Sequence, residues 1–146
     1  MKQRNGFTLI ELLAVIVILA IIALIATPMI LGVIDSAKKG AAESSAYGYI
    51  EAIENSTLQN MVETHDATLV DGKYKISSNG TTLTLQNADE TGAADPAVTI
   101  KVNFKGDNPK GADDVVEVTG GKISKATLTI NGFTVTYDGT RATATK

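Results

Sequence analysis

The chain contains no cysteine and no tryptophan, and it has a single histidine, His65. Without cysteine it can form neither a disulfide nor a thiolate metal site, so its stability must come from packing. His65 lacks the serine and carboxylate pattern of a catalytic constellation, and we expect it to be a surface residue. The sequence also contains no phosphate-binding glycine-rich loop. These absences argue against an enzyme and against a bound cofactor or metal.

The numbers of acidic and basic residues in the sequence are also nearly balanced. Sixteen acidic and thirteen basic residues give a net charge of −3 at pH 7, which lends no support to a general nucleic-acid surface. We therefore expect no specific nucleic-acid partner. Without a short leader and a spanning segment, about 110 residues remain, enough for one small domain with a single core.

One long apolar run dominates the chain. It extends from Phe7 to Ile34 with a single charge, Glu11, and about 20 apolar residues suffice to cross the roughly 30 Å hydrocarbon core of a bilayer. Lys2 and Arg4 precede the run, and positive charge at this end favours a cytoplasmic N-terminus. The sequence therefore predicts one membrane-spanning segment with the rest of the chain outside.

A cleaved signal peptide and a plain membrane anchor are the alternatives. A signal peptide has a shorter apolar region followed by an A-x-A type site, which this run lacks. A plain anchor leaves Glu11 unexplained, because an acidic side chain inside a membrane helix is costly and usually marks a function.

The N-terminal part of the chain carries a resemblance to a known family that covers roughly the first 60 of the 146 residues. The stretch KQRNG-FTLIELLAVIVILAIIALIATP resembles the N-terminus of a type IV prepilin: a short basic leader, Gly6, then Phe7 and an acid at Glu11. The resemblance implies that prepilin peptidase cuts between Gly6 and Phe7 and methylates the new amine of Phe7. Pro28 falls where the family carries a helix-kinking proline, whereas Ala20 stands where a glycine is often found. The lack of cysteine is similar to the pilins of Gram-positive bacteria.

Glu11 has two possible partners once the leader is removed. The new Phe7 amine would be a charge among apolar side chains, and a buried charge is far less costly when it is paired. Glu11 of one subunit could neutralise the Phe7 amine of the next and set the axial register. Geometry also permits a pair four residues apart within the same chain.

Beyond Ile34 the apolar pattern becomes periodic, which predicts that the helix continues to about Val62 as an amphipathic segment. The expected buried side is formed by Ile34, Ala37, Ala41, Tyr49, Ile53, Leu58 and Met61. Pro28 has no N–H and clashes with the carbonyl of Leu24, so a kink is expected there, although membrane helices also tolerate proline.

The remainder reads as strands with period-two alternation. Strands are predicted over Lys73–Ser77, Thr82–Gln86, Ala97–Phe104, a short stretch from Val115, Ala126–Ile130 and Phe133–Tyr137. Asn131-Gly132 is the dipeptide that a type I′ hairpin turn prefers. Asp107, Asp113 and Asp114 lie in a polar loop, but their order does not match a calcium-binding EF-hand.

These elements predict an α+β fold in which the outer half of a long helix packs on an antiparallel sheet of four or five strands. The expected parts are a leader at 1–6, a transmembrane and assembly helix at 7–34, its amphipathic half at 35–62 and a β-rich globular domain at 63–146. This arrangement resembles a pilin.

The resemblance implies a structural subunit of a type IV pilus. Such a chain is a single-pass membrane prepilin that later joins other copies in an extracellular helical filament. Its implied partners are prepilin peptidase, a platform protein and an assembly ATPase, and its assembly residues would be Glu11 and Pro28. The alternatives are a pseudopilin of a type II secretion or DNA-uptake machine, or a membrane-anchored binding module that does not polymerise.

Overall fold

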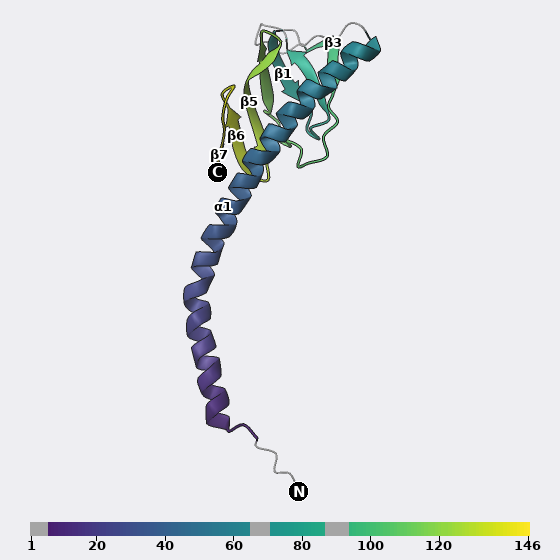
Figure 1. Ribbon diagram of the computed structural model, residues 1–146. Helices are drawn as coiled ribbons and strands as arrows, with labels where there is room; N and C mark the ends of the chain where they lie inside the picture. The colour runs from purple at the N-terminus through teal and green to yellow at the C-terminus, as the bar shows by residue number, and fades with distance from the viewer. Residues whose placement is uncertain (1–5, 65–70, 87–93) are drawn as a thin grey trace. The chain divides into compact units, whose positions relative to one another are not determined.

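The computed structural model describes residues 6–64, 71–86 and 94–146 (Figure 1). The chain divides into two compact units, Met1–Ala37 and Lys38–Lys146. A single helix, α1 (Leu9–Thr64), begins in the first unit and ends in the second. The predicted long helix is confirmed, and it continues through Pro28.

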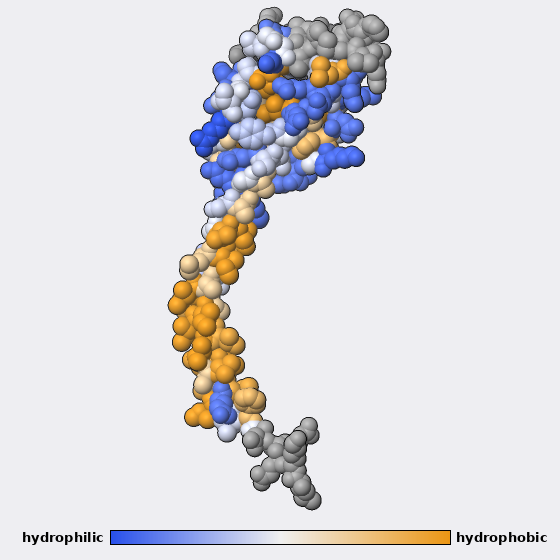
Figure 2. All heavy atoms as spheres, in the orientation of Figure 1, coloured by the Kyte–Doolittle hydropathy of each residue, from blue (hydrophilic) through white to orange (hydrophobic). Residues whose placement is uncertain are grey.

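The first unit presents its apolar side chains to the outside. Every residue from Leu9 to Leu24 is exposed, and hydrophobic residues cover the face of this helix that Figure 2 shows. Within the described chain, α1 is the one helix that is long and apolar enough to cross a membrane. A helix that is apolar all round, with no side turned to a core, needs an apolar environment around it.

The second unit buries one side of α1 against a sheet. Ala42, Ala46, Tyr49 and Ile53 are fully buried and follow the spacing of a single helix face. Part of the predicted face was wrong: Ala41 is exposed, and the Leu58 side chain is 60% exposed. Tyr49 and Ile53 are buried as predicted, whereas Ala42 is buried in place of Ala41, because the small residues there gave little contrast between the faces of the helix.

The sheet is antiparallel throughout and has seven strands in the order β3-β2-β1-β4-β5-β6-β7 (Figure 1). The strands are β1 (Gly72–Ile76), β2 (Thr82–Gln86), β3 (Ala94–Lys101), β4 (Val115–Thr119), β5 (Lys122–Ile130), β6 (Phe133–Tyr137) and β7 (Ala142–Thr145). Six of the seven strands were predicted by residue range, so the expected sheet of four or five strands was too small. The last strand was missed because it is only four residues long and its sequence, ATAT, has no large apolar residue.

Strands β1 and β2 form a hairpin, and β5 and β6 form another around the predicted Asn131-Gly132 turn. Asn131 and Gly132 have φ values of 53° and 80°, so both turn positions have the positive φ that a type I′ turn requires. The strand predicted over residues 97–104 instead spans Ala94–Lys101, and Val102 is buried just after its end.

The two faces of the sheet differ in chemistry. The face towards α1 contributes the buried apolar residues Tyr74, Ile76, Leu83, Ile100, Val116, Leu128, Val135 and Ala144. The other face is rich in hydroxyl groups, and one row across it runs through Thr99, Thr84, Lys75, Val115, Thr127, Thr136 and Thr143. Alternation along each strand therefore separates a core face from a polar face.

Candidate functional site

The N-terminal segment enters the helix through a short non-helical stretch. Gly6, Phe7 and Thr8 have no regular secondary structure, and the Phe7 side chain is 91% exposed. A Cβ atom added at Gly6 would meet no atom within 4 Å. The peptide bond between Gly6 and Phe7 therefore lies outside the helix, and no contact with the described residues requires a glycine at this position.

Thr8 and Glu11 form a reciprocal cap at the start of α1. Glu11 Oε2 accepts hydrogen bonds from the Thr8 N–H at 2.9 Å and from the Thr8 hydroxyl at 2.7 Å. The Glu11 N–H in turn points to Thr8 Oγ1 at 3.4 Å. This is the capping-box arrangement, which satisfies backbone donors that the first helical turn would leave unpaired.

The cap engages only one oxygen of the Glu11 carboxylate. Both hydrogen bonds from Thr8 reach Oε2, and no described residue donates to Oε1. One oxygen thus holds the start of the helix, while the other is open to a cation. Glu11 was predicted as a functional residue, but the capping role of Thr8 was not, although the spacing Thr-x-x-Glu before an apolar run is itself a capping signal.

The few hydroxyl groups of the apolar helix are satisfied within it. Thr27 Oγ1 donates to the Ala23 carbonyl at 2.7 Å, and Ser36 Oγ donates to the Gly32 carbonyl at 3.0 Å. Pro28 supplies no N–H, so the Leu24 carbonyl loses its usual helical partner. A hydroxyl bonded to its own backbone lowers the cost of placing the helix in an apolar medium.

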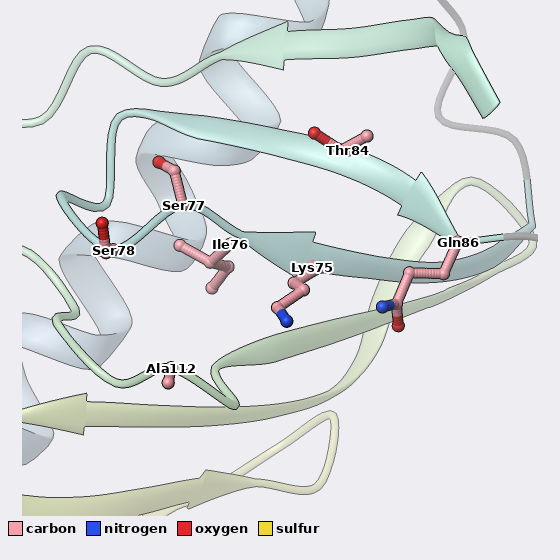
Figure 3. Close-up of a pocket in the computed structure, with 7 residues that line it drawn as sticks. All are labelled: Lys75, Ile76, Ser77, Ser78, Thr84, Gln86 and Ala112. Atoms are coloured by element: carbon pink, nitrogen blue, oxygen red, sulfur yellow. The ribbon is translucent and has the colours of Figure 1, made fainter. Parts of the chain in front are cut away.

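The globular unit offers a shallow pocket on the polar face of the sheet (Figure 3). Its volume is about 540 Å³, and it is lined by Lys75, Ile76, Ser77, Ser78, Thr84, Gln86 and Ala112. The Ser77 hydroxyl already accepts hydrogen bonds from the N–H groups of Thr81 and Thr82. Lys75 is the one charged side chain among these lining residues.

Two of the three loop aspartates, Asp107 and Asp114, make hydrogen bonds within the fold. Asp114 is buried, and its carboxylate accepts hydrogen bonds from the N–H groups of Gly111 at 2.7 Å and Thr129 at 2.8 Å. Asp107 accepts a hydrogen bond from the Asn131 amide at 2.8 Å. No group of three or more acidic or histidine side chains is placed to hold a metal ion in the described ranges, and His65 lies outside them.

A family model described as the prokaryotic N-terminal methylation motif matches residues 1–27. The match spans the basic leader, Gly6, Phe7, the Thr8–Glu11 cap and most of the exposed apolar helix. No curated protein and no solved structure matches the chain. The motif, joined to a long apolar helix and an α+β fold, supports a type IV pilin-like protein, of pilin or pseudopilin type.

Proposed function

We propose that the chain is a structural subunit of a type IV pilus. It would be made as a prepilin, inserted in the membrane, cut between Gly6 and Phe7, methylated on the Phe7 amine and stacked into a helical filament. The observation that carries this proposal is the methylation motif at residues 1–27, which coincides with a helix whose apolar side chains have no partner in the described chain. Motif and fold point to a structural protein rather than an enzyme.

The exposed helix supports both stages of this life cycle. Residues 9–34 need an apolar environment, which lipid supplies to the prepilin and which other copies of the same helix would supply in a filament. Lys2 and Arg4 favour a cytoplasmic N-terminus, leaving the globular unit outside the cell. Lipid already shields the helix before extraction, so extraction would gain little hydrophobic free energy and would need the platform protein and ATPase of an assembly machine.

Glu11 and Pro28 are the proposed assembly residues. Removal of the leader would create an amine at Phe7, and the open Oε1 atom of Glu11 is available to pair with it. The amine could belong to the same chain or to the next subunit, where the pair would fix the register. Pro28 removes the helical hydrogen bond to the Leu24 carbonyl, so we propose it as the point where the helix can bend when copies pack together.

Two substitutions separate the charge of Glu11 from its capping role. Glu11→Gln removes the charge but keeps a side chain that the capping box accepts, whereas Thr8→Val keeps the charge and removes the capping hydroxyl. We expect Glu11→Gln to abolish most filaments and Thr8→Val to reduce them less. The measurement is the amount of the chain in filaments sheared from cells, compared with its amount in the membrane.

The same measurement tests the proposal as a whole. Wild-type amounts of filament from Glu11→Gln would remove any role for the charge, and equal losses from both variants would assign the effect to the cap. A wild-type chain that is processed yet scarce in sheared filaments would be a pseudopilin. A chain that stays in the membrane with its leader intact would be a non-polymerising anchored module.

A further inference from the structure

Strand β7 is the last strand of the sheet and, among the described residues, pairs only with β6. An edge strand directs every second N–H group away from its neighbour, which leaves a template for pairing with another chain. All four residues of β7 are in register with β6, and hydrogen-bonded pairs alternate with non-hydrogen-bonded pairs along the two strands. The outward donors belong to Ala142 and Ala144, whose N–H groups donate to side chains of α1. A protein that gathers many copies of itself needs a means of closing such an edge.

Two side chains of α1 occupy both outward donors. The Ala142 N–H donates to Tyr47 Oη at 2.7 Å, and the Ala144 N–H donates to Glu43 Oε1 at 2.9 Å. These contacts join residues that are 95 and 101 positions apart in the chain. They are therefore tertiary contacts that fix the C-terminal strand against the helix.

The match between helix and strand has a geometric basis. Residues four apart on a helix are separated by about 6 Å along its axis, and residues two apart on a strand by about 6.8 Å. Glu43 and Tyr47 thus meet alternate N–H groups of β7 as a neighbouring strand would. The small side chains of Ala142 and Ala144 are buried. The Tyr47 ring packs edge-on against the Tyr137 ring, with 6.1 Å between the ring centroids.

We propose that Glu43 and Tyr47 are edge-closing residues that keep β7 from pairing with β7 of a second copy of the chain. The benefit for a filament rests on the proposed function, because apolar helices side by side would bring the sheets of many copies close together. The closure itself does not depend on that function and can be tested on the isolated full-length chain in detergent micelles.

The first readout is amide hydrogen exchange in the Glu43→Ala, Tyr47→Phe double variant. Phenylalanine keeps the ring against Tyr137 but offers no acceptor, so the change removes hydrogen bonds with little loss of packing. We expect exchange at Ala142 and Ala144 to become about tenfold faster or more, because a hydrogen bond to a charged group is lost together with a neutral one. Glu43→Gln keeps an acceptor oxygen and should stay close to wild type.

The second readout is disulfide cross-linking between two copies of the chain through one introduced cysteine. Because the chain has no cysteine of its own, any disulfide must involve the introduced residue. Symmetric antiparallel pairing of two β7 edges through Ala142 and Ala144 would place Thr143 opposite Thr143, with Cα atoms about 4.5 Å apart, within the range that a disulfide bridges. Thr143→Cys should form few dimers in the wild-type background and severalfold more in the double variant. Thr136→Cys, one strand further in, is the matched control.

Each outcome supports or overturns the proposal. Faster exchange with more Thr143→Cys dimers, and no change for Thr136→Cys, supports it. Unchanged exchange in the double variant shows that the side chains do not close the edge, and faster exchange without dimers shows that the helix backbone alone keeps copies apart; either result overturns it. The assay uses no pilus machinery, so its failure would leave the proposed function standing.

Discussion

The two parts of α1 have the same backbone conformation but opposite surroundings. In the first unit, the side chains of Leu9, Ile16 and Leu24 are more than half exposed, whereas in the second unit Tyr49 and Ile53 are fully buried. The first part is rich in isoleucine and valine, which are not strong helix formers in water. An apolar medium favours a helix there, because a helix pairs its backbone N–H and C=O groups with one another and leaves few of them without a hydrogen bond. The second part is stabilised by packing on a sheet.

The largest expected difference between the two parts concerns stability. Ile53→Ala should lower the free energy of unfolding of the globular unit by about 2–5 kcal/mol, because it leaves a cavity in the core. Ile16→Ala removes the same atoms from an exposed site and should change that free energy by less than about 0.5 kcal/mol. Denaturant unfolding of the full chain in micelles measures both. Equal effects would mean that the two parts share one core.

A smaller effect is expected at Tyr49, which carries a buried polar group. Its hydroxyl donates to the Gly80 carbonyl at 2.9 Å, and burial, together with the negative charge of Asp114, raises the pKa of Tyr49 well above its usual range. Tyr49→Phe keeps the edge-on ring contact with Phe104 but loses the hydrogen bond. We expect the free energy of unfolding to fall by about 1 kcal/mol in the same assay. No loss would show that water replaces the hydroxyl.

The smallest expected effect depends on pH and belongs to the turn between β6 and β7. Asp138 Oδ1 accepts hydrogen bonds from the Arg141 N–H and from the hydroxyl and N–H of Thr140, and these lower the pKa of Asp138 from 3.8 to about 2. A lowered pKa means that the folded state favours the charged form. The contribution is therefore full above about pH 4 and is lost as the pH falls towards 2.

Asp138→Asn should remove this part of the acid dependence of unfolding. Wild type should lose stability between pH 4 and pH 2 more steeply than the variant does, and the two curves should run parallel above that range. Asp113→Asn is the matched control, since Asp113 is exposed and its side chain makes no hydrogen bond with a described residue. If the control flattened the curve as much as Asp138→Asn, the turn would not be the source.

Much of the fold follows from local patterns in the sequence. The apolar run, the alternation of β1, β2, β5 and β6 and the Asn131-Gly132 turn each predicted their structure, because one physical requirement dominates each of them. For the apolar run the requirement is an apolar environment, for the strands it is burial of one face, and for the turn it is a positive φ. These elements also set the α+β class.

Other features depend on partners that are distant in the sequence. β7 is a strand because β6 lies on one side of it and Glu43 and Tyr47 lie on the other, and nothing within ATAT indicates either contact. The burial of Asp114 likewise depends on the N–H of Thr129, fifteen residues away. Thr8 differs from both, since its capping role could have been predicted from its spacing to Glu11.

We propose that residues 1–6 are a leader removed from a prepilin, and mass spectrometry of the N-terminal peptide of the chain purified from its own cells is the decisive experiment. We expect a chain that begins at Phe7 and carries one added methyl group on its amine. A chain that begins at Met1, or at an unmodified residue beyond the apolar helix, would contradict this proposal.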